Sequence, residues 1–157
     1  MISPLLIIAS IALLVAVLIN KLFQSDYGWF NRLRRPQWLT FESAIPFIWI
    51  SVFICGVYSA YELWIKQPGK TETWLFMGAY LLLEILIMAY TPVMCKLRSL
   101  QAGTIIGATG FFWGLILAVL LWPISRVSVF LLLPYLLWSP VGTYVTWEMI
   151  SLNPLDK

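Results

Sequence analysis

The chain has 157 residues, of which 61% are hydrophobic and only 11% are charged. About a quarter of the residues in a water-soluble domain are charged, because its surface faces water, so this composition indicates an integral membrane protein. The sequence contains no histidine, and its two cysteines are not spaced as metal ligands. The net charge is +3, and the basic residues form no long run. We therefore expect no metal site, no disulfide framework and no nucleic-acid partner.

Five stretches are long and apolar enough to cross a bilayer, whose hydrocarbon core of about 30 Å needs about 20 helical residues. We expect these spans at about 4–23, 45–65, 73–95, 103–122 and 127–152. The first lacks the basic start and the cleavage site of a signal peptide, so it is interpreted as a span. The sequence predicts an all-α fold, with residues 1–157 forming one domain, an integral membrane bundle of five transmembrane helices.

The segment 24–41 between the first two spans is much longer than the other connections and carries arginines and aromatic residues. Trp29, Arg35, Pro36 and Trp38 are its prominent members. One interpretation is an interfacial belt at headgroup level. The other is a lid that folds over one end of the bundle.

The basic residues are divided unequally between the two ends of the bundle. Lys66, Lys70 and Arg126 fall at one end. The other seven fall at the opposite end: Lys21, Arg32, Arg34, Arg35, Lys96, Arg98 and Lys157. The positive-inside rule then predicts an outside N-terminus and a cytoplasmic C-terminus, in a bacterial inner membrane or an organelle membrane.

Glu84 lies about halfway along the third span, where a carboxylate costs about 3 kcal/mol on insertion scales and usually faces the bundle interior. No lysine or arginine occupies a matching depth, so we expect Glu84 to be protonated or hydrogen-bonded to a neutral partner. Tyr80 and Thr91 are close along the same helix. A polar group in a ligand cavity and a structural hydrogen bond between helices are both consistent with this position.

Glycines recur at spacings of four, three and four along one face of the fourth span: Gly103, Gly107, Gly110 and Gly114. Small residues at such spacing let another helix approach closely. The pattern predicts packing within the bundle or a homodimer seam.

The sequence has nine tryptophans. Four lie near span ends, where an aromatic belt explains them: Trp64, Trp74, Trp122 and Trp147. Trp49, Trp113 and Trp138 are deeper, where converging indole faces would suit a flat aromatic ligand, although ordinary packing explains Trp113. Prolines near these depths are expected to bend three helices and to open space between them. These prolines are Pro46, Pro92, Pro134 and Pro140.

Several of these residues stand in an order that resembles the tryptophan-rich sensory protein and translocator protein family, which includes the peripheral benzodiazepine receptor. The matching positions in 29–153 are Trp29, Phe30, Leu33, Arg35, Pro36, Trp38, Pro46, Trp49, Tyr90, Thr91, Pro92, Pro134, Tyr135, Leu136, Trp138, Leu152 and Asn153. The first helix lies outside this likeness.

The resemblance implies a five-helix bundle, often dimeric, with a pocket between helices that the first loop closes. It implies a porphyrin or other tetrapyrrole as ligand, with no cofactor required. Carried over by motif, the pocket would comprise Trp38, Trp49, Phe53, Tyr90, Thr91, Tyr135, Trp138 and Gly142.

The sequence departs from the family where the family carries prolines and polar amides. Thr40 and Phe41 replace two prolines, and the span-three and span-five amide positions hold other residues: Leu83, Ile87 and the pair Val145–Thr146. These changes imply a drier site, in which Glu84 would supply polarity. No basic residue follows Tyr144 closely, which disfavours a sterol-recognition pattern.

The leading hypothesis is a receptor-like protein that binds a flat hydrophobic ligand for sensing, handling or stress regulation. Without histidine, a bound haem would have no imidazole ligand. The alternatives are a small transporter of tetrapyrrole-like molecules, for which no internal repeat is evident, and a structural or partner-binding membrane protein. Light-dependent tetrapyrrole degradation is a further activity implied by the resemblance, but no nucleophile–base pair supports an enzyme, and no catalytic residue is assigned.

Overall fold

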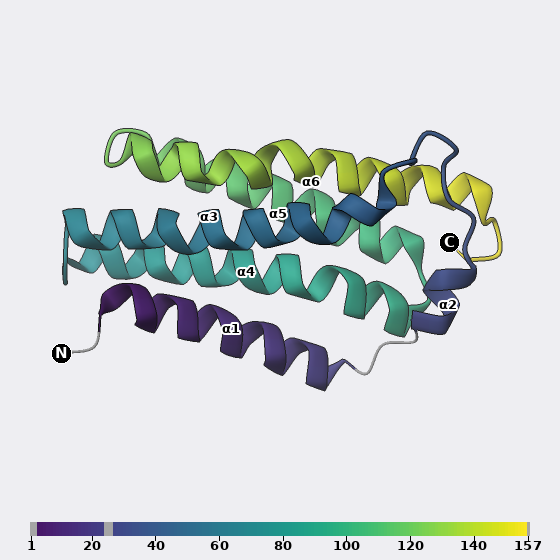
Figure 1. The fold of residues 1–157 in the computed structure, drawn as a ribbon, viewed down its shortest axis with the longest axis horizontal. Coiled ribbons are helices and arrows are strands. Elements are labelled where there is room, and N and C mark those ends of the chain that lie inside the picture. The colour runs from purple at the N-terminus through teal and green to yellow at the C-terminus, as the bar shows by residue number, and fades with distance from the viewer. Residues whose placement is uncertain (1–2, 24–26, 157) are drawn as a thin grey trace.

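The structure is a computed structural model that describes residues 3–23 and 27–156 (Figure 1). Its elements in chain order are α1 (Pro4–Leu22), α2 (Tyr27–Arg32), the 3-10 helix η1 (Glu42–Ala44), α3 (Ile45–Lys66), α4 (Thr71–Leu97), α5 (Leu100–Leu121) and α6 (Arg126–Leu152). The start of the predicted connecting segment, 24–26, and Lys157 of the charge count lie outside the described residues.

Five of these helices are long and apolar enough to span a membrane, so the predicted five-span, all-α fold is confirmed. The helices remain apolar on the side that faces away from the bundle, where Phe47, Leu75 and Leu137 are exposed. Such surfaces are stable in lipid, and lipid also forces each backbone to satisfy its hydrogen bonds within a helix. Ser99 and Ser125 cap α5 and α6 by accepting hydrogen bonds from Ala102 N and Ser128 N.

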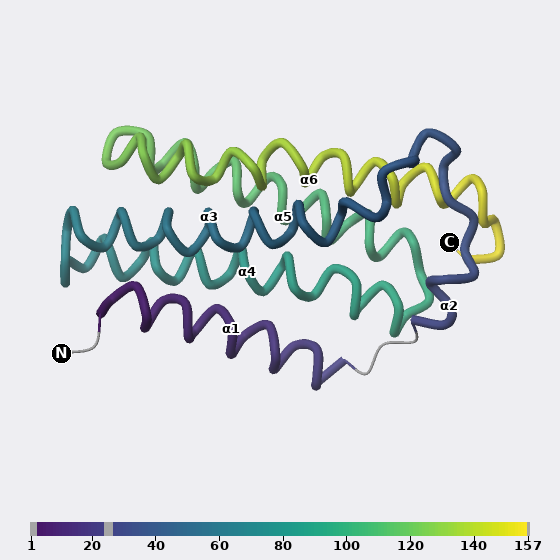
Figure 2. The backbone as a smooth tube through the Cα atoms, viewed as in Figure 1, coloured from purple at the N-terminus to yellow at the C-terminus, as the bar shows by residue number. Residues whose placement is uncertain are grey.

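The five long helices alternate in direction, so that the N-terminus lies at one end of the bundle and the C-terminus at the other (Figures 1 and 2). Around the bundle, α1 contacts α3 and α4, α3 contacts α6, α6 contacts α5, and α5 contacts α4. These five contacts form a ring, in which α3 and α4 touch each other far less than they touch their other neighbours.

Two serines join α3 to α6 by hydrogen bonds in the interior. Ser59 Oγ donates to Ser128 O at 2.7 Å, and Ser128 Oγ donates to Ser59 O at 3.0 Å. Both side chains are buried, and reciprocal hydrogen bonds leave neither hydroxyl unsatisfied in an apolar surrounding.

The prolines behave differently from one another. Pro92, Pro134 and Pro140 lie inside α4 and α6, which continue through them. The expectation that Pro46 bends the second span was wrong, because Pro46 lies in the first turn of α3. A proline there removes no helical hydrogen bond, since the first amide groups of a helix have no partner in it.

Candidate functional site

A cavity of about 520 Å³ lies between α1, α3 and α4 and reaches α6. It occupies the gap that the weak contact between α3 and α4 leaves in the ring. Its wall is largely aliphatic and includes Ile8 and Ile11 of α1, Val57 of α3, Met77 of α4 and Leu132 of α6. The first helix therefore contributes directly to the site.

Aromatic side chains form a further part of the wall. Trp64 and Trp74 meet edge to face with ring centroids 5.0 Å apart, and Phe53 and Tyr80 line the cavity deeper in the bundle. We had expected Trp64 and Trp74 in an interfacial belt, and Trp74 is indeed 61% exposed. The turn at 67–70 brings the two indoles together, and that short connection was the signal in the sequence for their pairing.

Glu84 also lines this cavity. Its Oε1 atom is buried and has no hydrogen-bond partner among the described residues. Tyr80, one turn earlier, is hydrogen-bonded to Ser59 Oγ at 2.5 Å rather than to Glu84. The neutral partner expected for Glu84 is therefore not supplied by Tyr80.

Another, much smaller space of about 30 Å³ lies where α3, α4, α5 and α6 meet. We call it the crevice; it is lined by Trp49, Leu86, Ile87, Tyr90, Ile106, Gly107, Gly110, Tyr135, Trp138, Ser139, Gly142 and Thr143. The hydroxyls of Tyr90 and Thr146 are hydrogen-bonded beside it, whereas Trp138 Nε1 and Thr143 Oγ1 are buried without a partner among the described residues. Because Ile87 and Tyr135 line both spaces, they separate the crevice from the cavity.

The structure thus divides the site residues predicted by motif. Phe53, Glu84 and Tyr135 line the cavity. Trp49, Tyr90, Tyr135, Trp138 and Gly142 line the crevice. Thr91 lines neither space, and Trp38 lies 40% exposed on the surface.

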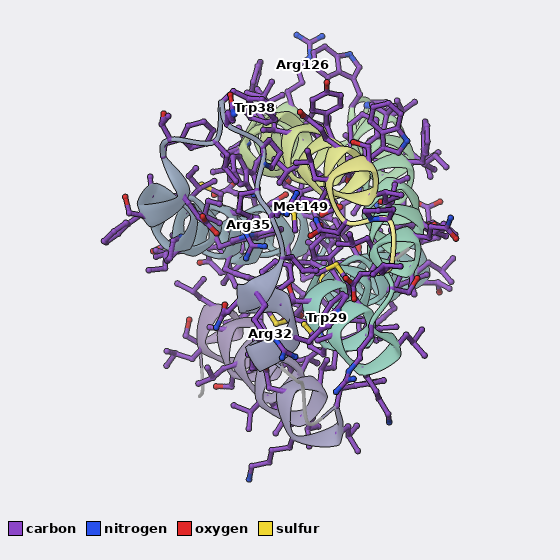
Figure 3. The ribbon with its side chains drawn as sticks, turned by 90° about the vertical axis from the view of Figure 1, so that its right-hand side faces the viewer. Trp29, Arg32, Arg35, Trp38, Arg126 and Met149 are labelled. Carbon is purple, nitrogen blue, oxygen red and sulfur yellow. The ribbon has the colours of Figure 1, made fainter. Side chains whose placement is uncertain are left out.

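The first connecting segment lies at the opposite end of the bundle from the turn beside the cavity, and Figure 3 views this end. It packs through Trp29 and Leu33 against Met94, Leu100 and Met149. It contains the short helix α2. The segment therefore does not cover the cavity, although Phe41 contacts Trp138 of the crevice with ring centroids 6.4 Å apart.

Hydrogen bonds attach this segment to the end of α6 and the residues after it. Trp29 Nε1 donates to Asp156 Oδ1 at 2.7 Å, and Trp38 Nε1 donates to Glu148 Oε2 at 2.7 Å. Arg35 pairs with Glu42 of η1 at 3.1 Å and lies 4.2 Å from the ring centroid of Phe30 in α2. Pro36 is buried.

The glycine face of α5 points into the bundle. A Cβ atom at Gly103 would lie 2.5 Å from Met94 Sδ of α4, and one at Gly107 would lie 2.6 Å from Thr143 Oγ1 of α6. At Gly110 and Gly114 the neighbour is Tyr135. These four positions therefore let α4 and α6 approach α5 within one chain.

Trp113 also has a packing role. Its Nε1 atom donates to Ala79 O at 2.9 Å, which joins α5 to α4. Among the described residues, no group of three histidine, cysteine or acidic side chains is placed to hold a metal ion.

Five apolar helices, four of which line an interhelical cavity, define a multi-pass α-helical membrane protein. The sequence profile of the TspO/MBR family matches residues 5–152, so the chain belongs to this family. The match confirms the resemblance and extends it to α1, which the motifs had left out.

Individual relatives agree with this assignment. The chain is 29% identical over 134 residues to the tryptophan-rich protein TspO of Bacillus cereus. The aligned region covers 85% of this chain and 86% of that protein. It is 26% identical over 154 residues to translocator protein 2 of Mus musculus, with 91% and 90% covered. It is 23% identical over 128 residues to the tryptophan-rich sensory protein of Cereibacter sphaeroides, with 80% and 77% covered.

Proposed function

We propose that this protein binds a flat hydrophobic ligand of the tetrapyrrole type in the cavity between α1, α3, α4 and α6. The observation that carries the proposal is the cavity itself. Its volume of about 520 Å³ falls within the range of about 300–1,000 Å³ that is typical of small-molecule sites, and its wall is apolar with few polar groups.

The aromatic wall supports a flat ligand in particular. Phe53 and Tyr80 offer faces and edges in the interior, and the Trp64–Trp74 pair stands beside the turn that joins α3 to α4. Stacked or edge-to-face contacts with these rings would add to the free energy of burying the ligand surface. The crevice, at about 30 Å³, would need its helices to separate before it could admit a tetrapyrrole.

The names of the relatives indicate a biological role in general terms. Their names describe a sensory protein and a translocator protein. We propose that ligand binding here serves sensing or handling of the ligand rather than its chemical conversion. We also propose that the end of the bundle with Arg32, Arg34 and Arg35 is cytoplasmic.

A cavity-filling substitution tests the site. A Cβ atom at Gly56 would meet nothing within 4 Å, and Gly56 lines the cavity, so the side chain of Gly56→Leu occupies part of the ligand space. We expect wild-type protein in detergent to bind protoporphyrin saturably, with Gly56→Leu weakening the affinity about tenfold or more. The measurement is the absorbance change of the pigment.

Gly56→Ala is the matched control for the glycine replacement, and Trp138→Phe reports on the crevice. Both should retain the wild-type affinity. If Trp138→Phe lost binding while Gly56→Leu retained it, the ligand site would be the crevice rather than the cavity. An absence of saturable binding by the wild type would contradict the proposed function.

A further inference from the structure

The position of Glu84 restricts the kind of ligand that the cavity accepts. Among the described residues that line the cavity, Glu84 is the only acidic or basic one, and no lysine or arginine lines the cavity with it. Its Oε1 atom is buried and has no protein donor among the described residues. A buried polar group without a partner costs about 1–3 kcal/mol.

Tyr80 cannot supply the missing donor in this arrangement. Ser59 has one hydroxyl hydrogen, which it donates to Ser128 O at 2.7 Å. The contact of 2.5 Å between Ser59 Oγ and Tyr80 Oη must then use the hydrogen of Tyr80. The hydroxyl of Tyr80 is thereby committed to Ser59.

Tyr135 is directed elsewhere as well. Its hydroxyl oxygen would lie 2.8 Å from a Cβ atom placed on Gly110, so the hydroxyl lies against α5 rather than beside Glu84. The two tyrosines that line the cavity near this depth therefore leave the carboxyl group of Glu84 available to a bound molecule.

We propose that Glu84 is a specificity-determining residue that selects ligands with an N–H donor, such as a protonated amine or a pyrrole-type N–H, and disfavours ligands whose carboxylate would enter the cavity. A protonated amine beside Glu84 would favour the carboxylate form of its side chain and donate a charge-assisted hydrogen bond to it, which replaces the missing partner. Two carboxylates at one apolar site repel each other. This inference rests on the proposed function: a tetrapyrrole would bind with its nitrogen-bearing part toward Glu84 and its acidic side chains toward the cavity mouth.

Three matched probes test the selectivity: aminomethyl-anthracene, methylanthracene and anthracene carboxylate, each substituted on the central ring. They share a flat skeleton and differ in the charge and donor capacity of one group. Binding is followed by tryptophan-to-anthracene energy transfer in uncharged detergent. We expect wild-type protein to bind the amine about tenfold or more tightly than the methyl compound, and the carboxylate more weakly than both.

Substitution of Glu84 should change the ratio of affinities. In Glu84→Leu we expect the amine-to-methyl ratio to fall to within about twofold, and in Glu84→Gln to an intermediate value, because an amide oxygen still accepts a hydrogen bond. Glu62→Gln removes a carboxylate that does not line the cavity and should keep the wild-type ratio. The helical circular-dichroism signal checks that each variant is folded.

The outcomes separate this inference from the proposed function. Equal binding of amine and methyl compound, or tighter binding of the carboxylate, would overturn the role of Glu84 while leaving the cavity as a binding site. Failure of all three probes to bind saturably, or binding unaffected by Gly56→Leu, would instead contradict the cavity as the site.

Discussion

Tyr135 forms part of the wall between the cavity and the crevice, and two glycines of α5 leave room for its ring. Cβ atoms on Gly110 and Gly114 would lie 2.8 Å from its hydroxyl oxygen and 2.6 Å from its Cε1 atom. Because these positions carry only hydrogen atoms, the ring can lie this close to α5. The glycines thus shape the site although they line the cavity nowhere themselves.

Gly114→Ala should therefore destabilise the protein. Overpacking of an interior typically costs about 1–3 kcal/mol, which exceeds the gain of about 1 kcal/mol in helix propensity. We expect a lower midpoint of thermal unfolding, measured by circular dichroism in detergent. Gly78→Ala is the matched control, because its Cβ atom would meet nothing within 4 Å, and its midpoint should stay equal or rise. A Gly114→Ala midpoint at or above that of the wild type would show that the Tyr135 ring is not held in this way.

At the scale of elements, the connection between α1 and α3 is attached to the chain that follows α6. Asn153 accepts a hydrogen bond from Arg34 N at 2.9 Å through Oδ1 and donates to Arg34 O at 3.1 Å through Nδ2. An amide side chain can satisfy both backbone groups of one residue, which neither leucine nor alanine can do. With Trp29 bonded to Asp156, this pairing orders the segment at the end remote from the cavity.

Asn153→Ala should loosen this segment without impairing the cavity. Loss of both hydrogen bonds leaves the backbone of Arg34 open to proteases, so we expect faster trypsin cleavage after Arg34, measured by mass spectrometry of timed digests. Ser151→Ala is a control nearby, since the Ser151 hydroxyl donates to Glu148 O within α6. If protoporphyrin affinity fell together with protease resistance, the segment would act on the binding site as a lid.

In the whole molecule, most of the described basic residues lie at one end of the bundle, and the cavity lies toward the other end. The described basic residues at the α2 end number six: Lys21, Arg32, Arg34, Arg35, Lys96 and Arg98. Lys66, Lys70 and Arg126 lie at the other end, the side of the Trp64–Trp74 pair. With the proposed orientation, the cavity would lie in the outer half of the membrane.

Cysteine labelling tests that orientation. Lys70→Cys and Gln37→Cys place thiols at exposed positions on opposite ends, while the native Cys55 and Cys95 lie within spans. In intact cells or organelles, a membrane-impermeant maleimide should label Lys70→Cys, and it should label Gln37→Cys only after permeabilisation. The reverse pattern would invert the orientation.

The glycine face of α5 serves the packing of helices within one chain. Those four glycines contact α4 and α6 of the same chain, so they do not offer a seam to a second copy. A homodimer stays a prediction, and it would have to use a surface that faces lipid.

The spans were predictable from the sequence to within about three residues at each end, because crossing a membrane is a local requirement on length and polarity. Glu84 was identifiable for the same reason, since a carboxylate in an apolar helix is visible without any partner. The family motifs were also local, and they correctly indicated the TspO/MBR family.

Only the tertiary structure decided which helix faces meet. Phe53 and Trp49 are one turn apart on α3, yet one lines the cavity and the other the crevice. The isoleucines of α1 could not be assigned to the site in advance, because an apolar residue that faces lipid and one that faces a cavity satisfy the same solvation requirement. In a membrane, hydrophobicity determines that a helix crosses, whereas close packing of particular side chains determines where space between helices is left.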